Sequence, residues 1–283
     1  MSKVLIIGSK GMAGHIIYNV LKEKTDFEIT DIARGNDMHI PTYQLDVTDF
    51  SVLTEVINSE RPSVVINCIG VLNKDAEERP ENAILLNSYF PHFLAKLGEH
   101  GKFKLIHIST DCVFSGRKGG YTEQSEKDGT GFYAQTKALG EVTYGNHLTL
   151  RTSIIGPELK ENGIGLFHWF MKQKGTVKGY RQAYWTGVTT IELAKAIISA
   201  IDQNISGLHH LVNQEKINKY DLISLFKKQF KKNEAEIIPF DDYKVDKSLI
   251  KTNTDFKYAV PSYEKMIIEM KNWMDSHPAF YNY

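Results

Sequence analysis

The chain has 283 residues, of which 42% are hydrophobic, and its 34 basic and 34 acidic residues give a formal net charge of zero. A chain of this length and composition can bury one large core, or one core and a smaller lobe. The balanced charge argues against nucleic acid or an anionic membrane surface as the main partner.

The N-terminal sequence MSKVLIIG predicts a strand and not a signal peptide, because no long apolar stretch precedes a cleavage site. No apolar run is long enough to span a bilayer. The two cysteines, Cys68 and Cys112, lie in apolar strand-like runs and lack the spacing of a disulfide framework. We therefore expect a cytoplasmic protein.

Short β-branched runs alternate with helical patterns through the first half of the chain. Strands are expected at 4–7, 28–33, 43–46, 63–68, 104–109 and 148–150, and helices at 12–24, 49–60, 80–99 and 132–144. This alternation predicts an α/β protein with a Rossmann-type doubly wound parallel sheet. In such a sheet the carboxyl ends of the strands meet at one edge, where ligands bind.

The pattern changes after Arg151, where glycine, proline and aromatic residues become more frequent. Helices are expected at 190–202, 219–231 and 263–275. We expect residues 1–152 to form the Rossmann domain, together with a returning segment at about 187–206. The remaining stretches, 153–186 and 207–283, are expected to form a smaller, mainly helical C-terminal lobe that binds the substrate.

The first predicted strand runs into Gly8-Ser9-Lys10-Gly11-Met12-Ala13-Gly14, a G-x-x-G-x-x-G pattern that opens a helix. Glycine allows a tight turn, lets the backbone approach a pyrophosphate, and lets the helix pack close to the strand. The helix N-terminus then offers free N–H groups and a positive dipole end to the phosphates. This turn predicts a dinucleotide site, with contacts from Gly8, Lys10, Gly11, Met12 and Gly14.

The end of the second strand bears on the choice of cofactor. An acidic side chain there would bind a ribose 2′-hydroxyl, whereas an arginine would pair with a 2′-phosphate. Asp31 falls inside the predicted strand and Arg34 at its end. We therefore favour Arg34 and NADPH, with NADH as the other option. Further cofactor contacts are expected after the third and fourth strands, from Asp46, Val47, Cys68, Ile69 and Gly70.

A second group of residues is expected at the same edge of the sheet. Thr110 ends a strand, and Tyr133 and Lys137 are four residues apart on a predicted helix, so they share one face. A lysine ammonium beside a phenol lowers the phenol's pKa from about 10. Tyr133 would then exchange a proton with a carbonyl or hydroxyl oxygen, while Thr110 hydrogen-bonds that oxygen. These three residues predict a catalytic set for an NADP(H)-dependent oxidoreductase, in which Tyr133 and Lys137 also contact the cofactor.

Four further motifs follow the glycine turn in a distinctive order. They are STDCVFSG at 109–116, Tyr121-Thr122-Glu123, YAQTKALGE at 133–141 and LRTS at 150–153. Together they resemble the motifs of the extended short-chain dehydrogenase/reductases, and more narrowly of the dTDP-4-dehydrorhamnose reductase-like branch. The resemblance covers the residues up to about 155 well and the rest loosely.

The resemblance implies NADPH-dependent reduction of the 4-keto group of a nucleotide-linked 4-keto-6-deoxysugar, in bacterial surface polysaccharide biosynthesis. It implies that Thr110 and Tyr133 contact the keto oxygen, and that Lys137 binds the nicotinamide ribose and tunes Tyr133. The sugar side of the cleft would be lined by Asp111, Val113 and Phe114. Two later residues are also substrate candidates: Arg181 for the diphosphate, and Trp185 for stacking on a base or sugar.

Two segments on the substrate-facing side depart from the rhamnose-type pattern. Ile154 stands where a tryptophan usually follows LRTS, and 182–190 replaces a D-Q-x-G-x-P-T segment. The substrate can therefore be dTDP-4-dehydrorhamnose or a related keto sugar such as a UDP-linked 2-acetamido-2,6-dideoxy-4-ulose. We expect a nucleotide-sugar substrate and no metal site, no nucleic acid and no membrane partner; a homodimer is the protein assembly left open.

Three other functions share the glycine turn. A sugar-nucleotide 4,6-dehydratase needs an acid and a base beside the threonine, commonly Asp-Glu, but Cys112 follows Asp111 here. An epimerase would retain its cofactor between half-reactions. A non-catalytic NADP-binding regulator need not keep Tyr133 and Lys137, and their presence favours an enzyme.

Overall fold

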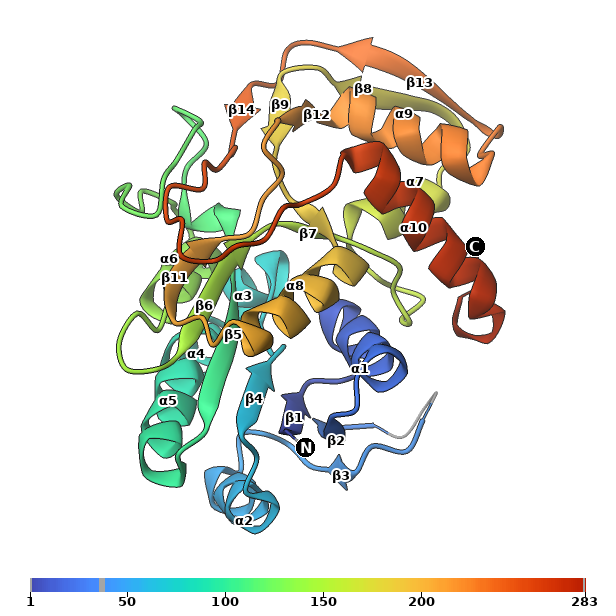
Figure 1. The fold of residues 1–283 in the computed structure, drawn as a ribbon. Coiled ribbons are helices and arrows are strands. Elements are labelled where there is room, and N and C mark those ends of the chain that lie inside the picture. Colours follow the sequence, from blue (N-terminus) through green and yellow to red (C-terminus); the bar gives the residue numbers. More distant parts are fainter. Residues whose placement is uncertain (1, 36–38, 282) are drawn as a thin grey trace.

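The computed structural model describes residues 2–35, 39–281 and 283. Its centre is a seven-stranded sheet in the order β11-β6-β5-β4-β1-β2-β3 (Figure 1). Every neighbouring pair in this sheet is parallel. This confirms the predicted Rossmann-type fold. The strands are β1 (Lys3–Ile7), β2 (Glu28–Ala33), β3 (Tyr43–Gln44), β4 (Val64–Asn67), β5 (Lys104–Thr110), β6 (Leu148–Thr152) and β11 (Gly207–His210).

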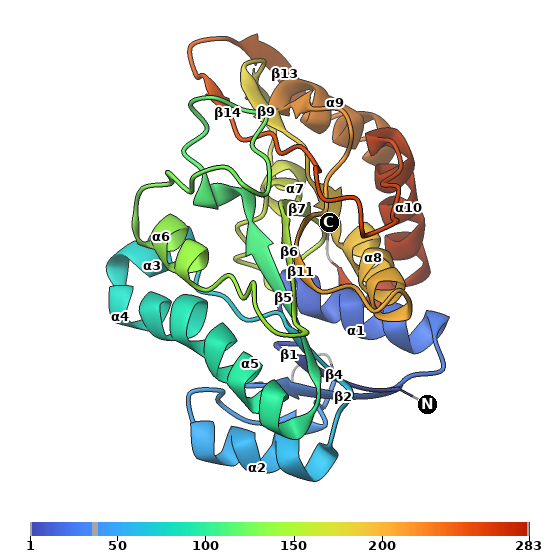
Figure 2. The same cartoon turned by 60° about the vertical axis from the view of Figure 1, so that its left-hand side comes forward.

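Helices cover both faces of the sheet (Figure 2). Val4 and Ile6 of β1 belong to one buried cluster, together with residues of α1 (Met12–Lys24) and α8 (Thr190–Asp202). Leu5 and Ile7, which alternate with them, belong to a second cluster with α2 (Phe50–Glu60) and α5 (Phe90–Gly101). Since successive side chains of a strand point to opposite faces, a strand buried on both sides is apolar throughout.

The predicted helix at 80–99 is continuous but not uniform. It consists of α4 (Pro80–Ala83), a π-helical turn η1 (Ile84–Tyr89) and α5, and it follows the short α3 (Asn73–Glu78). The π turn places Asn87 in the interior, where its side chain accepts from Val71 N at 2.8 Å and donates to Thr136 Oγ1 at 3.1 Å. Thr136 lies on α6 (Phe132–Leu139), so η1 holds α6 in place.

A set of elements lies beyond the carboxyl ends of the sheet strands in both views (Figures 1 and 2). We call these the distal elements. They combine short strands with helices. They are β8 (Gly175–Tyr180), β9 (Ala183–Trp185), β12 (Ile217–Asn218), β13 (Ala235–Phe240), β14 (Val245–Asp246), α7 (Leu166–Met171) and α9 (Lys219–Phe230).

The remaining elements connect the distal elements to the sheet. Two-residue strands β7 (Ile154–Ile155) and β10 (Val188–Thr189) pair in parallel between them. The long helix α10 (Tyr263–Ser276) contacts both α8 and α9, and it precedes the short turn η3 (Pro278–Phe280). Another short turn, η2 (Asp111–Val113), follows β5. Among the described residues, we find no helix with the length and apolar character needed to cross a bilayer.

Three local predictions differ from the structure. The third strand is only Tyr43–Gln44, and α6 ends at Leu139, not near 144. Residues 207–210, expected in the smaller lobe, pair with β6 at the edge of the main sheet instead. Gly140 is the C-cap residue of α6, and a Cβ there would lie 1.8 Å from Asn87 O, so only glycine fits where the helix ends against η1.

Candidate active site

Each of the three glycines of the first turn has a different structural role. Gly8 has a φ of +89°, in the left-handed region that favours glycine. A Cβ on Gly14 would lie 2.1 Å from Gly8 O, so only glycine lets α1 pack this close to the turn. Gly11 is exposed and stands at the N-cap of α1, where it leaves the first N–H groups of a 13-residue helix without a side-chain acceptor. This cradle fits the pyrophosphate of a dinucleotide.

The other predicted cofactor residues reach the same edge. The end of β4 lies directly against the turn, since a Cβ on Gly8 would meet Ile69 Cδ1 at 2.9 Å and Cys68 C at 3.3 Å. Burial raises the pKa of the Cys68 thiol to about 12, so this cysteine is a neutral packing group. Gly70 follows it, and a Cβ there would lie 3.5 Å from Asn87 Oδ1. Lys10 lies on the turn, Met12 is the first residue of α1, and Asp46 and Val47 follow β3.

Asp31 is fully engaged inside the protein. Ser9 Oγ donates to its Oδ2 at 2.5 Å, and Thr42 N and Oγ1 donate to its Oδ1 at 2.9 and 3.0 Å. His39 Nε2 lies 2.9 Å from Oδ2. Burial alone would raise the pKa of Asp31, but these hydrogen bonds hold it below its ordinary value. Both carboxylate oxygens are therefore occupied by hydrogen bonds within the protein, and Asp31 is not free to bind a ribose hydroxyl.

Arg34 has the opposite environment. Its side chain is 79% exposed, and Nη1 lies 3.8 Å from Asp46 Oδ2, a long and solvated ion pair. Arg34 is the residue that directly follows β2, at the carboxyl edge of the sheet. An exposed arginine that follows the second strand of a Rossmann fold is suited to pairing with a cofactor 2′-phosphate.

Thr110, Tyr133 and Lys137 come from two elements that pack together, β5 and α6. Thr110 is the last residue of β5, and its Oγ1 accepts from Cys112 N at 3.1 Å. Burial raises the pKa of Tyr133, the nearby Cys112 acts in the same direction, and a hydrogen bond with Thr110 opposes them. The predicted threonine and phenol are therefore in contact.

Lys137 is buried, with only 5% of its surface exposed. Its Nζ donates to Ile108 O at 2.8 Å and lies 3.3 Å from His107 Nε2. Burial lowers the pKa of Lys137 to about 8, and the charge of Glu141 opposes that effect. The pKa of Tyr133 is raised and not lowered as we expected, because burial dominates at the phenol.

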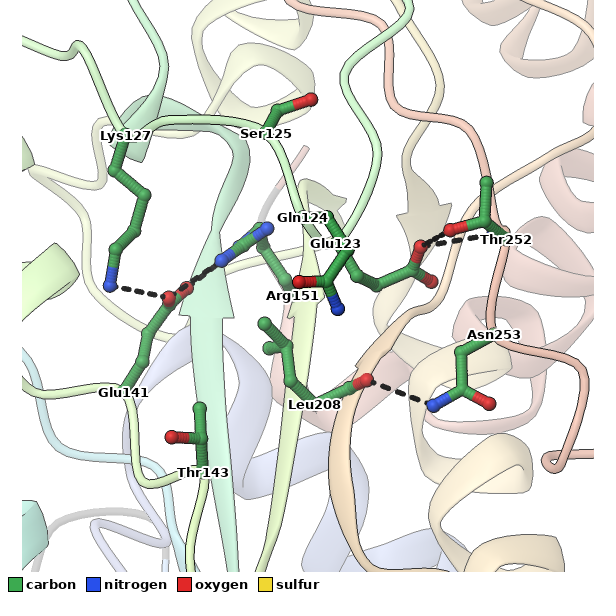
Figure 3. Close-up of a pocket in the computed structure, with 10 residues that line it drawn as sticks. All are labelled: Glu123, Gln124, Ser125, Lys127, Glu141, Thr143, Arg151, Leu208, Thr252 and Asn253. Atoms are coloured by element: carbon green, nitrogen blue, oxygen red, sulfur yellow. Dashed lines mark hydrogen bonds and ion pairs between the residues drawn. The ribbon is translucent and has the colours of Figure 1, made fainter.

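A buried ion pair between Glu141 and Arg151 lies next to the carboxyl end of β5 (Figure 3). Glu141 accepts from Arg151 Nε at 2.7 Å and from Arg151 Nη2 at 2.6 Å. Ser109 Oγ donates to the same carboxylate at 2.7 Å, and the exposed Lys127 reaches it at 3.2 Å. This arrangement explains the final glutamate of YAQTKALGE and the arginine of LRTS: they fasten the end of α6 to β5 and β6.

An open pocket of about 590 Å³ adjoins this pair. Its wall includes Glu123, whose carboxylate accepts from Thr252 Oγ1 at 2.5 Å and from His210 N at 3.1 Å (Figure 3). The glutamate of the Tyr121-Thr122-Glu123 motif thereby joins the segment around Thr252 to β11. No predicted catalytic or cofactor residue lines this pocket, which is formed by Glu123, Gln124, Ser125, Lys127, Glu141, Thr143, Arg151, Leu208, Thr252 and Asn253.

The structure corrects several substrate-side expectations. Val113 and Phe114 have no exposed surface and pack in a small apolar cluster, so they cannot contact a sugar. Trp185 is 2% exposed and packs against Tyr263, with ring centroids 5.8 Å apart. Arg181 is exposed at the end of β8 and pairs with Asp241 through both Nε and Nη2. Of the five predicted substrate residues, Asp111 is the one directly beside Thr110.

Two lysines that sequence reasoning missed lie near Asp111. Burial raises the pKa of Asp111, and the positive charges of Lys247 and Lys219 oppose that effect. Burial lowers the pKa of Lys219 to about 8, and its Nζ lies 5.2 Å from the centroid of the Trp185 ring. Neither lysine belongs to a motif. Each follows a two-residue strand, so no periodic pattern could have placed it at the site.

Comparison with known proteins gives a consistent set of relatives. The chain is 24% identical over 228 residues to a probable low-salt glycan biosynthesis reductase of Haloferax volcanii, covering 76% of each chain. It is 25% identical over 255 residues to the methionine adenosyltransferase 2 subunit beta of Xenopus tropicalis, covering 85% of this chain and 75% of that one. The solved dTDP-4-dehydrorhamnose reductase of Bacillus anthracis, in complex with NADP, matches with a TM-score of 0.81 at 19% identity, over 96% of this chain and 99% of that one.

The family itself is shown by a match that spans most of the chain. Residues 2–258 match the family described as RmlD substrate binding domain. This confirms the resemblance that the motifs carried, and the match extends well past residue 155, through the distal elements. The chain belongs to the RmlD substrate binding domain family.

Proposed function

We propose that this protein is an NADP(H)-dependent reductase that converts the 4-keto group of a nucleotide-linked 4-keto-6-deoxysugar to an alcohol, in glycan or surface polysaccharide biosynthesis. The observation that supports the proposal is the contact between Thr110 and Tyr133, with Lys137 one helical turn after Tyr133, at the same edge of the sheet as the glycine cradle. Relatives named as a glycan biosynthesis reductase and a dTDP-4-dehydrorhamnose reductase support the same class of reaction.

The cofactor would lie across the glycine turn, with its pyrophosphate at the N-terminus of α1 and a 2′-phosphate at Arg34. NADPH supplies a hydride to the keto carbon when it is bound. Thr110 holds the keto oxygen by a hydrogen bond, and Tyr133 gives that oxygen its proton. Lys137 then stabilises the phenolate that remains, because an ammonium close to a phenolate favours the charged form.

The substrate lies on the side of Asp111, where Lys219 and Lys247 bring positive charge. These lysines suit the diphosphate of a sugar nucleotide better than Arg181, which is already paired with Asp241. Both dTDP-4-dehydrorhamnose and a UDP-linked 2-acetamido-2,6-dideoxy-4-ulose carry that group. The positive charge of the site therefore does not discriminate between these two substrates, and a measurement of turnover with each is needed.

The test is NADPH oxidation, followed by absorbance, with a panel of dTDP- and UDP-linked 4-keto-6-deoxysugars. We expect one of them to be reduced, and Tyr133→Phe to lower kcat by about 100-fold or more, as loss of a general acid does. Tyr89→Phe, an exposed tyrosine on η1, is the matched control and should retain full activity. Equal activity in Tyr133→Phe and wild type would refute the proposed role of the phenol.

A second candidate is a regulatory subunit that binds NADP(H) without turnover. It is favoured by the match to methionine adenosyltransferase 2 subunit beta over 85% of this chain. Tight NADPH binding with no oxidation across the whole panel would support this candidate. A dehydratase is disfavoured because burial raises the pKa of the Cys112 thiol to about 11, which makes it a poor proton relay.

A further inference from the structure

His107 is the polar side chain of β5 that lies against Lys137. It has no exposed surface, and neither the motifs nor the proposed chemistry uses it. The Lys137 Nζ lies 3.3 Å from His107 Nε2 and donates a separate hydrogen bond to Ile108 O at 2.8 Å. His107 is therefore one of the direct neighbours of the Lys137 nitrogen.

Asn67, the last residue of β4, contacts the other side of the same ring. Its Nδ2 lies 3.2 Å from His107 Nδ1, while its Oδ1 accepts from Ile69 N at 3.0 Å. The bond to Ile69 fixes the orientation of the amide, so Asn67 presents an N–H to the histidine. Both ring nitrogens of His107 thus face a nitrogen atom.

The number of hydrogen bonds that Asn67, His107 and Lys137 can make with one another depends on the charge of Lys137. Burial holds the pKa of His107 well below 6.5, so the ring is neutral and has one N–H. A Lys137 ammonium has only hydrogens to offer, so Nε2 must accept and the ring proton is left on Nδ1, facing the Asn67 N–H. A neutral Lys137 amine instead accepts from Nε2–H, and Nδ1 then accepts from Asn67. Every contact is satisfied only when Lys137 is neutral.

We propose that His107 is a positioning residue that sets the protonation state of Lys137 through its ring tautomer, and thereby the pH range in which Tyr133 can act as a proton donor. The proposal rests on the proposed reductase function, because it assigns a role to the lysine of that site. The proposal places the His107 ring proton on Nδ1 while Lys137 is charged and on Nε2 once Lys137 is neutral.

The other charged groups around the pair are few. Glu141, just past the end of α6, favours the Lys137 ammonium, and Tyr133 lies one turn earlier on the same helix. The charge of His92 on α5, like that of Lys137, disfavours a charged imidazole at His107. Burial lowers the pKa of Lys137 to about 8, so the change of tautomer is expected at mildly alkaline pH.

The direct test uses the full-length wild-type protein with ¹⁵N-labelled histidine rings. The His107 signals are identified by their absence in His107→Gln. Between about pH 7 and about pH 9.5, we expect the ring proton of His107 to move from Nδ1 to Nε2, without double protonation at any point. A ring that keeps one tautomer over this whole range would overturn the proposal.

Kinetics supply the second arm. The glutamine oxygen of His107→Gln can accept from an ammonium, so the pKa of Lys137 should rise. The alkaline limb of kcat for ketone reduction should then move up by about one pH unit or more, since a pKa shift moves the limb by the same amount. His209→Gln, a buried histidine on β11 bonded to Ser206 O, is the matched control and should leave the limb unchanged.

An alkaline limb that is the same in wild type and His107→Gln, or that moves equally in His209→Gln, would contradict the role of His107. The two arms also separate this inference from the proposed function. A tautomer change in a protein that reduces no keto sugar would support the coupling of His107 to Lys137 and count against the reductase alone.

Discussion

At the scale of single residues, two side chains of opposite charge, one on β2 and one just past it, are the candidates for recognising the ribose or 2′-phosphate of a cofactor. Asp31 is the acid that sequence reasoning weighed for a ribose hydroxyl, and the fold engages both of its oxygens. Arg34 is exposed and makes one long contact with Asp46. The hydrogen bonds of Asp31, which no local pattern predicts, therefore favour NADPH over NADH.

The corresponding prediction concerns Arg34→Gln. Removing the guanidinium should weaken NADPH binding by about 10-fold or more, as expected for a charge-assisted pair with phosphate, and leave NADH binding unchanged. The measurement is the Kd of each cofactor by fluorescence titration, with Arg117→Gln, another exposed arginine, as control. If both cofactors weaken equally, Arg34 does not recognise the 2′-phosphate.

At the scale of elements, the position of α6 depends on contacts outside its own sequence. The π turn η1 buries Asn87, which bonds to Thr136 on α6, and Gly140 packs on Asn87 O where a Cβ would clash. Beyond the helix end, Glu141 pairs with the buried Arg151. These contacts fix the middle and the carboxyl end of the helix that carries Tyr133 and Lys137.

Glu123 also connects separate elements, since it accepts hydrogen bonds from β11 and from Thr252. Its carboxylate makes the free energy of unfolding depend on pH. Burial alone would raise its pKa, but hydrogen bonds from Thr252 and the neighbouring His210 lower it to about 2. A depressed folded-state pKa gives stability that is present above the ordinary value of 4.5 and is lost as pH falls toward 2. The full effect is about 3 kcal/mol, at 1.36 kcal/mol per pKa unit.

We therefore expect Glu123→Gln to reduce the free energy of unfolding by about 3 kcal/mol near neutral pH and by much less near pH 3, where wild type has lost most of the benefit. Urea unfolding at several pH values measures the difference. The exposed Glu126→Gln serves as control. A wild-type to variant difference that stays constant with pH would show that the charge of Glu123 contributes nothing.

At the scale of the whole molecule, the sequence predicted what local patterns encode. Alternating apolar strands and helices predicted the doubly wound sheet, and the glycine pattern predicted the cradle at the N-terminus of α1. The spacing of Tyr133 and Lys137 gave one helix face. Most of the helix bounds were predicted closely, and Thr190–Asp202 was predicted to the residue.

The parts that could not be predicted depend on contacts between distant segments. Val113 and Phe114 occupy motif positions close to Thr110, yet their side chains pack in an apolar cluster with Tyr121 and Leu249. Lys219 approaches Asp111 only because the distal elements lie over the sheet edge. His107 lies inside an apolar strand pattern, and its role follows from Asn67 and Lys137, which are far away in sequence.

The most direct test of the whole account is a crystal structure of this protein with NADP(H) bound. The account predicts a pyrophosphate at Gly8–Gly14, a 2′-phosphate at Arg34, and a nicotinamide ring beside Tyr133 with its ribose in reach of Lys137. A dinucleotide bound with its nicotinamide end away from Tyr133 and Lys137, or bound outside the glycine cradle, would contradict it.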